Sequence, residues 1–406
     1  MSRTYGLTVS KLALAMAMAG VIALPAQAVD FDGYFRAGPG ATSKGAARAC
    51  YNLSGAGVSG AGTHYRLGNE CDFYGEFGLA QTGTVDGVTY KAKVMFNEYN
   101  PGTDIGTSSS SFNQMYVEGK GFDIAPNTNF WVGKRFYGRA DVHILDYKFT
   151  QLDGVGAGAD SISVGGGKLG LAYFRTDNGN LGSSTTPGTR LNADLTELGV
   201  NAGGKLRLTG TYTKGDFSGG TSGYALSLQH DQENFLGLGG GNTLWVQYAQ
   251  GSAGMNQNFG NLTAPSGTKG FRVVESMTWQ KGALGGQGVA LWETNKDATT
   301  GLKTDMISVG GRASYAIGKN FKLVGEAGYS QKKPEGSPTQ KLAKFTFAPT
   351  LSTGPGFWNR PELRLYVTTA KWNSAANAGA GPAGLTGLSN GKTSGTSYGA
   401  QAEIWF

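Results

Sequence analysis

Hydrophobic and polar positions alternate along most of this chain, in segments separated by clusters of Gly, Asn, Asp, Ser and Pro. Side chains of a β-strand point alternately to its two faces, so each segment is predicted to be a strand with one apolar and one polar face. The apolar side is rich in aromatic and branched residues, as a lipid-facing band requires, whereas the other side is too polar for a protein core. The pattern therefore predicts an all-β fold, a transmembrane antiparallel β-barrel.

The number of strands follows from a parity argument. Nineteen alternating runs can be counted, but a bacterial barrel with both termini in the periplasm needs an even number. We assign residues 143–152 to a long loop, because a flexible glycine stretch at 154–158 follows them. About eighteen strands remain, and a barrel of that size leaves an aqueous channel that an inward-folded constriction loop would narrow.

The connections between strands are expected to be of two kinds. Short turns such as 166–168 and 202–204 fit the periplasmic side, and long polar stretches fit extracellular loops. Disorder is an alternative for some of the long stretches, and sequence does not separate the two. The long stretches lie at about residues 38–64, 99–112, 176–192, 251–269 and 373–395.

Several predicted strands carry an aromatic ring on their charged face. Tyr34 alternates with Phe31, Gly33 and Phe35 and shares a face with Arg36. In a soluble sheet a ring would normally go with the apolar face, so these rings are predicted to line a wet surface on which a flat, partly apolar solute can stack. The rings placed in this way are Tyr34, Tyr74, Trp358 and Trp405, with Trp245 on the presumed lumenal face beside Thr243 and Gln247.

The first 28 residues read as a secretory signal peptide. Two cations, Arg3 and Lys11, precede an apolar run at 12–24, and an A-x-A cleavage site ends at Ala28. The rival interpretation, a membrane anchor, is weak because the run is too short to span a bilayer. The mature domain is therefore expected to be 29–406, and strand-like sequence starts at once, which leaves no room for the plug of an energy-coupled receptor. Without the two cations the formal charge falls from +7 to +5, spread along the chain, so no nucleic-acid partner is predicted.

Cysteine and histidine usage is sparse. An exported protein in an oxidising compartment would pair its only cysteines, Cys50 and Cys71. Closing that loop would stabilise the fold by roughly 3 kcal/mol on the chain-entropy model. The only histidines, His64, His143 and His230, do not lie at ligand spacing to the cysteines, so no metal site and no cofactor are predicted.

Several local motifs resemble one known family. They are Val29-Asp30-Phe31-Asp32-Gly33-Tyr34, Tyr65-Arg66-Leu67-Gly68-Asn69-Glu70-Cys71, Gly133-Lys134-Arg135-Phe136-Tyr137, Trp358 with Arg360-Pro361, and Glu403-Ile404-Trp405-Phe406. With these motifs the mature chain resembles the maltoporin family, and residues 176–350 match more loosely. The resemblance implies a homotrimeric, eighteen-stranded channel in the outer membrane of a Gram-negative cell, surrounded by lipid. It also implies passive transport of maltose and maltodextrin-like oligosaccharides along an aromatic strip, with Cys50 and Cys71 paired.

The resemblance also implies roles for residues by position. The aromatic strip would include Tyr34, Tyr74, Trp358 and Trp405; the polar track Arg36, Arg66, Glu76, Arg139 and Asp146; and the constriction Asp141, His143, Asp146 and Lys148. Three positions depart from the family pattern. Lys148 stands where the family has a tyrosine, Gly241 where it has a strip phenylalanine, and Asn113 where it has a track arginine. The sugar that is preferred stays open for this reason.

Other functions stay open alternatives. Within the same class, the channel would instead favour sucrose, another oligosaccharide or small anions, or act as a general diffusion porin. An inward-pointing Lys148 should favour anionic or more hydrated solutes. An outer-membrane enzyme is the alternative from another class, but it needs a nucleophile with a base in reach. His230-Asp231 follows Ser227 closely, yet no G-x-S-x-G motif is present, and no enzyme is predicted.

Individual residues have less specific alternatives. Tyr34 and Trp405, both near chain ends, would also fit an interfacial aromatic girdle of the kind that barrels carry at both rims. The arginines Arg36, Arg66 and Arg139 would also fit a purely electrostatic role, setting the lumenal field against acidic residues instead of contacting solute.

Overall fold

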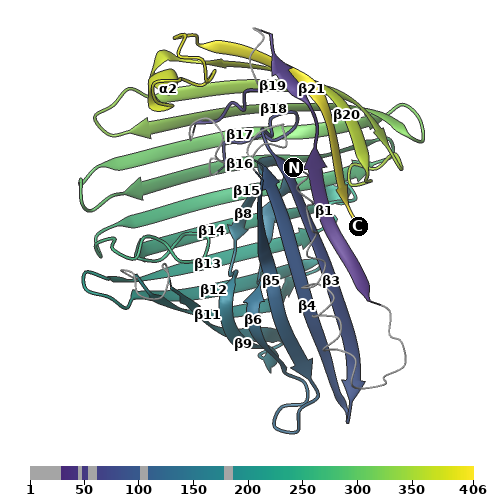
Figure 1. The fold of residues 1–406 in the computed structure, drawn as a ribbon, viewed down its shortest axis with the longest axis vertical. Coiled ribbons are helices and arrows are strands. Elements are labelled where there is room, and N and C mark those ends of the chain that lie inside the picture. Colours follow the sequence, from purple (N-terminus) through teal and green to yellow (C-terminus); the bar gives the residue numbers. More distant parts are fainter. Residues whose placement is uncertain (1–28, 44–47, 54–61, 101–107, 178–185) are drawn as a thin grey trace, which may run out of the picture.

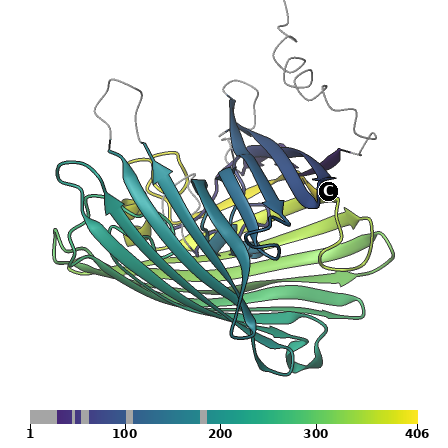
Figure 2. The same cartoon turned by 90° about the horizontal axis from the view of Figure 1, so that it is seen from below.

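A closed antiparallel barrel forms the whole fold (Figures 1 and 2). The computed structural model describes residues 29–43, 48–53, 62–100, 108–177 and 186–406. Within this part of the chain, eighteen strands follow one another round the wall. The ring closes because β1 (Asp30–Ala37) pairs both with β3 (Phe73–Val85) and with β21 (Ser394–Trp405). The predicted all-β barrel of about eighteen strands is confirmed.

The wall strands lie in sequence order and are 7 to 14 residues long. Between β3 and the constriction loop lie β4 (Val88–Asn100), β5 (Ser109–Lys120) and β6 (Asn129–Arg135). After the loop come β9 (Gly154–Val164), β10 (Gly167–Thr176), β11 (Gly188–Asn201), β12 (Gly204–Gly215), β13 (Ser222–Glu233) and β14 (Gly241–Gly251). The remaining wall strands are β15 (Lys269–Lys281), β16 (Leu284–Lys296), β17 (Lys303–Ala316), β18 (Phe321–Pro334), β19 (Gln340–Ser352) and β20 (Glu362–Trp372).

The two faces of the wall differ as the alternation requires. On β20, Leu363 and Leu365 are 57% and 64% exposed on the outer face, while their neighbour Arg364 is 2% exposed on the inner face. The same alternation places Trp292 of β16 outside and Glu293 inside. A lipid bilayer is the solvent that suits such an outer face, because only closed barrels and helices satisfy all backbone hydrogen bonds in hydrocarbon. No helix in the described part of the chain is long and apolar enough to cross a membrane.

The predicted constriction loop departs from the wall between β6 and β9. It contains a separate two-stranded sheet, β7 (Ala140–Val142) with β8 (Tyr147–Thr150), joined by the 3₁₀ turn η1 (His143–Leu145). Residues 143–152 are therefore not a wall strand, as the parity argument predicted. Ile144, Leu145 and Phe149 are fully buried, because the loop lies inside the barrel.

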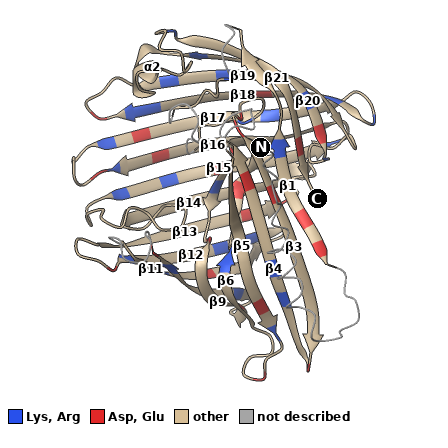
Figure 3. Ribbon diagram, viewed as in Figure 1, with Lys and Arg blue, Asp and Glu red and all other residues tan. Residues whose placement is uncertain are grey.

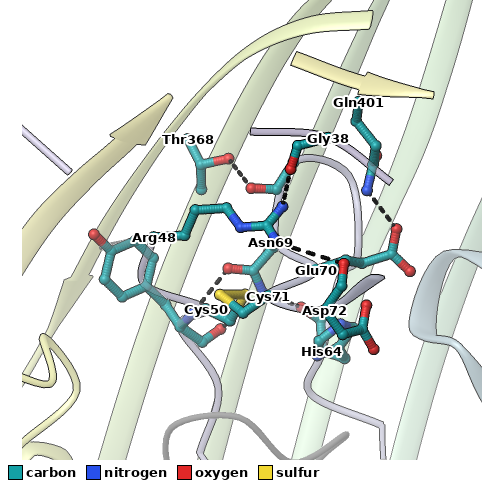
Figure 4. The surroundings of a disulfide bond; sticks show 12 residues. Gly38, Arg48, Cys50, His64, Asn69, Glu70, Cys71, Asp72, Thr368 and Gln401 are labelled. Atoms are coloured by element: carbon teal, nitrogen blue, oxygen red, sulfur yellow. Dashed lines mark hydrogen bonds between the residues drawn. A yellow bond between two sulfur atoms is a disulfide. The ribbon is translucent and has the colours of Figure 1, made fainter. Parts of the chain in front are cut away.

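The first long loop also enters the barrel, which corrects the prediction that residues 38–64 are simply extracellular. A short strand, β2 (Gly40–Thr42), continues the ladder along β21, and residues 62–70 are all buried. Tyr65 packs on the inner faces of β17 and β18, where Gly310 and Gly328 leave room for its ring. The predicted disulfide between Cys50 and Cys71 is present and ties the two ends of this loop (Figure 4).

Other connections differ in detail from the predicted loops. Residues 188–192 belong to β11, and residues 101–107 and 178–185 lie outside the described part. A second 3₁₀ turn, η2 (Phe235–Gly237), joins β13 to β14. The last long loop carries α2 (Ser374–Gly379), whose N-cap Asn373 accepts a hydrogen bond from the Ala376 amide at 3.0 Å.

Trp358 does not lie on a strand as predicted. Strand β20 begins only at Glu362, and Trp358 belongs to the preceding turn. The turn nevertheless folds into the lumen, because Phe357 is 3% exposed in the same cluster as Trp245. The ring therefore reaches the inside of the barrel by a different route from the one that alternation suggested.

Candidate functional site

The constriction loop is held in the lumen by contacts with two other parts of the chain. The Arg66 amide of the first loop donates to the Ile144 carbonyl at 2.9 Å, so the two inward loops are joined directly. On the opposite wall, the Gln247 amide Nε2 donates to the Phe149 carbonyl at 2.7 Å. These contacts fix the constriction loop to the first loop on one side and to β14 on the other.

Trp245 supports the constriction loop. Its ring lies 5.4 Å from that of Phe149, and its indole Nε1 donates to Gln229 at 2.9 Å. Only 2% of the residue is exposed, so the loop covers the face that a solute would need for stacking. The structure places Trp245 inside the barrel, as predicted, but beneath the loop.

Two tyrosines form one end of a row of aromatic rings, which we call the aromatic strip. Tyr34 on β1 and Tyr74 on β3 are both half-buried, and their ring centroids are 6.3 Å apart. The Tyr34 hydroxyl donates to Glu403 at 3.2 Å and accepts a hydrogen bond from Arg66. Both rings therefore face the lumen and not the lipid.

Two tryptophans continue the strip toward the end of the barrel where the chain ends. Trp405 is the direct cross-strand partner of Tyr34, so both side chains stand on the same face. The Trp358 ring lies 6.3 Å from that of Trp405, and 42% and 36% of these residues are exposed. The exposed part of each indole faces water in the lumen.

His143 of the constriction loop stands edge-on to both tryptophans, with ring centroids 5.4 Å from Trp358 and 5.7 Å from Trp405. Burial lowers its pKa well below the usual range, an effect that Glu403 opposes and Arg66 reinforces. The imidazole is therefore neutral, and its ring edge completes the wall around the two indoles.

A continuous network of ion pairs surrounds the strip. It contains five basic and five acidic side chains, which balance: Arg36, Arg66, Lys322, Arg360 and Arg364 against Glu70, Asp72, Asp146, Glu362 and Glu403. Burial by itself would raise the pKa of Asp146, but the Arg66 and Arg36 guanidiniums outweigh it and hold that pKa well below its usual range. Asp146 is therefore a carboxylate at neutral pH.

The network divides the predicted polar track into covered and open members. The Arg66 side chain is 4% exposed and its donors are occupied, with Glu70 Oε1 2.6 Å from Nε. Arg36 is covered as well, because its side chain is 11% exposed and its donors are occupied by Glu70, Asp72 and Asp146. The Asp146 side chain is 29% exposed and retains open surface. Arg66 can therefore act on a solute chiefly through Tyr34, whose hydroxyl it holds.

Glu70, Glu362 and Glu403 are members that the sequence prediction missed. Glu362 and Glu403 were visible on the charged faces of alternating strands, but Glu70 lies in a loop whose path no local pattern reveals. Figure 4 shows Glu70 beside the disulfide, where Gln401 of β21 donates to its Oε2 at 2.8 Å. The disulfide thus anchors the segment that brings Glu70 and Arg66 to the wall.

The remaining predicted track residues lie in separate pairs. Glu76 accepts from the Tyr74 hydroxyl and from Asn113 Nδ2, the latter at 2.9 Å. Arg139 pairs with Asp153 at 2.6 Å and lies over the Phe136 ring, with its side chain 26% exposed. Asn113, which replaces a family arginine, therefore orients Tyr74 and Glu76 by hydrogen bonds instead of by charge.

Lys148 and Asp141 stand opposite each other in the β7–β8 sheet. The Lys148 side chain is half-buried and has no carboxylate within ion-pair distance among the described residues. Asp141 is exposed and lines a lumenal cavity of about 330 Å³ together with His143, Trp358 and Trp405. Gly241 lines the same cavity, so the absent phenylalanine leaves open space there. The described residues include no group of three or more His, Cys, Asp or Glu side chains able to hold a metal ion.

Comparison with known families decides the identity of this barrel. The model of the LamB porin family matches residues 29–406, which is nearly the whole chain. The chain belongs to the LamB porin family. It is therefore an outer-membrane β-barrel of the porin type, and the predicted family and location are confirmed. A porin fold points to a channel and not to an enzyme.

Solved structures of several porins are similar to this chain at low sequence identity. The anion-selective porin from Comamonas acidovorans is 10% identical, with 93% of this chain and 100% of that chain covered and a TM-score of 0.50. OmpT of Vibrio cholerae in its trimer form is 12% identical over 93% of this chain and 99% of its own, with a TM-score of 0.41. A mutant of the Rh. blastica porin is 13% identical over 93% and 100%, with a TM-score of 0.42.

Proposed function

We propose that this porin is a passive sugar channel whose main solutes are maltose and maltodextrins, and that it works as a homotrimer. The observation that carries the proposal is the row of four lumenal rings, Tyr74, Tyr34, Trp405 and Trp358, with neighbouring centroids 6.3 Å apart at both ends. A pyranose has an apolar C–H face and hydroxylated edges, so a ring holds the face without fixed hydrogen bonds. Successive rings let a chain of sugars move from one site to the next.

The charged neighbours supply the second half of the mechanism. Asp146 keeps open surface within the network around the rings, and Arg139 keeps open surface elsewhere in the lumen. Charge-assisted hydrogen bonds to hydroxyl groups are stronger than neutral ones. Because the central network balances its charges, it offers both donors and acceptors without favouring anions or cations. A solute must bind well enough to enter and weakly enough to leave, which weak repeated sites achieve.

Arg66 has a different role in this scheme. Its side chain is covered, and it holds the Tyr34 hydroxyl, which also donates to Glu403. It is a positioning residue that keeps the Tyr34 ring face toward the bore. Trp245 is not required as a stacking site, because Phe149 covers it.

The test is the block of ion current by maltohexaose in a planar lipid bilayer. Trp358→Ala should weaken the block about tenfold or more, since loss of one stacking contact of 1–3 kcal/mol corresponds to roughly that factor. The matched control is Trp292→Ala, an indole 44% exposed on the outer face. Undiminished current at millimolar sugar in the native porin would refute the sugar channel and leave a general porin.

Lys148 favours a second candidate, a channel for anionic or more hydrated solutes. Its ammonium stands at the constriction without a carboxylate in ion-pair distance among the residues that the structure describes. Zero-current potentials in a salt gradient should show anion preference that Lys148→Gln removes. Lys148→Tyr should strengthen maltodextrin block if the side chain reaches the solute path, and an unchanged block would place it outside that path.

A further inference from the structure

Three lysines stand side by side on the outer wall of the barrel, at one rim. Lys269, Lys296 and Lys303 are direct cross-strand partners on β15, β16 and β17. Neighbouring strands lie about 4.8 Å apart, so the three stems of this lysine row stand within about 10 Å. All three residues are exposed, and Figure 3 shows basic residues at these strand ends.

The positive charges of the lysine row are not neutralised by ion pairs with carboxylates among the described residues. Within the described residues none of its ammonium groups forms an ion pair, although acidic residues are close. Asp297 accepts hydrogen bonds from the turn that follows it, Asp305 stands opposite Lys333, and Glu335 accepts from the backbone amide of Lys303 at 2.9 Å. Like charges directly opposite each other destabilise a sheet. An external anion would remove that repulsion.

An apolar, partly aromatic surface lies below the row on the same outer face; it adjoins the row on β15, and Thr294 on β16 and Asp305 on β17 stand between. Phe271 is two residues along β15 from the row, and Trp292 and Ile307 are four residues along β16 and β17. Trp292 and Ile307 are 44% and 45% exposed, and the Trp292 ring lies 5.7 Å from that of Phe271. At about 3.4 Å per residue this surface spans roughly 7 to 14 Å below the ammonium groups.

The rim also offers space for a head group. A cavity of about 280 Å³ is lined by Lys269 and Lys296 together with Gln250, Thr268 and Asp297. It lies at the end of the barrel that carries the long loops, which in porins is the extracellular end. The row therefore stands at the outer leaflet, with polar space above it and hydrocarbon-facing side chains below.

We propose that the lysine row binds the phosphate groups of an anionic lipid of the outer leaflet, whose acyl chains lie along Phe271, Trp292 and Ile307. Ammonium–phosphate contacts are charge-assisted, and clusters of basic residues beside a membrane surface attract anionic lipids. A lipid suits the site better than free phosphate because Phe271 adjoins the row and Trp292 and Ile307 extend the apolar surface away from the rim. The proposal is independent of the sugar pathway, since the row faces away from the lumen.

The test measures lipid binding by the full-length porin, purified in detergent and titrated with lipid by native mass spectrometry. The probes are bisphosphorylated lipid A, its dephosphorylated form and phosphatidylcholine. The triple variant Lys269→Gln, Lys296→Gln, Lys303→Gln should bind the bisphosphorylated lipid at least tenfold more weakly and leave the other two probes unchanged. The control, Lys281→Gln with Lys319→Gln, removes exposed lysines at the opposite rim and should bind normally.

Several results would overturn the proposal. Equal binding of bisphosphorylated lipid A by native porin and triple variant would do so, as would displacement of the lipid by millimolar inorganic phosphate, which would indicate a free-phosphate site. A triple variant whose only change is a smaller oligomer mass would show that the row faces a second copy of the chain. Single-channel ion conductance, measured in parallel, should stay at the native level in the triple variant and so confirms that its barrel is folded.

Discussion

Phe149→Ala should release the constriction loop, although Phe149 itself is not part of the aromatic strip. The Phe149 side chain is fully buried, 5.4 Å from the Trp245 ring and 5.0 Å from the Tyr147 ring, and the Arg272 guanidinium lies over it at 4.8 Å. Truncating a buried phenylalanine to alanine costs about 3–5 kcal/mol. Because 1.4 kcal/mol is a tenfold change in an equilibrium constant, the detached state of the loop should become about two to four orders of magnitude more populated.

Hydrogen exchange of the loop amides is the direct assay. The Gln151 amide donates to the Asn256 carbonyl at 2.8 Å and the Ile144 amide to Gln287 at 3.2 Å, so both bonds leave the loop and both amides report detachment. Single-channel recordings should show increased current noise. The matched control is Phe345→Ala, which removes the same atoms from an outer-face ring that is 51% exposed. Unchanged protection of both amides in Phe149→Ala would refute the view that this packing holds the loop.

Three further outcomes follow from the first loop. The Lys344 ammonium donates to three backbone carbonyls of the first loop, and Lys344→Met leaves them unpaired at a cost of about 1–3 kcal/mol each. The loosened loop should raise single-channel conductance, and an unchanged conductance would contradict this anchoring role. Burial, reinforced by Lys344, lowers the pKa of His64 to about 3, so the stability that depends on the neutral imidazole is complete above about pH 6.5 and falls as the pH drops toward 3. His64→Gln should flatten the thermal unfolding midpoint between pH 7.5 and 5, and an equal slope in both proteins would be the contrary result. A Cβ at Gly328 would clash with the Tyr65 ring, so Gly328→Ala should lower the free energy of unfolding by about 1–3 kcal/mol in denaturant titrations. Gly325→Ala, with no atom within 4 Å of the added Cβ, should leave it unchanged, and equal free energies for the two variants would count against the fit.

Local information was sufficient for the wall of the barrel. Alternation with period two depends only on a residue and its nearest neighbours, so it located the strands and placed Tyr34, Tyr74 and Trp405 on the wet face. The parity of an antiparallel barrel then removed residues 143–152 from the wall. The pairing of Cys50 with Cys71 needed only the number of cysteines and the compartment.

Long-range packing decided what no local pattern encodes. Glu70 and Arg66 belong to a loop, and only the closed barrel brings them to Glu403, more than 300 residues away. Trp245 has the alternation of a lumenal ring, yet the constriction loop covers it.

The sequence by itself determined which face of each strand is wet, because side-chain direction is a property of single strands. The tertiary structure decided which wet side chains remain open to a solute and which outer ones stand together, because that depends on register and on loops folded inward. Lys269, Lys296 and Lys303 show the difference. They lie within a 35-residue stretch of sequence, but only strand pairing aligns them into one row.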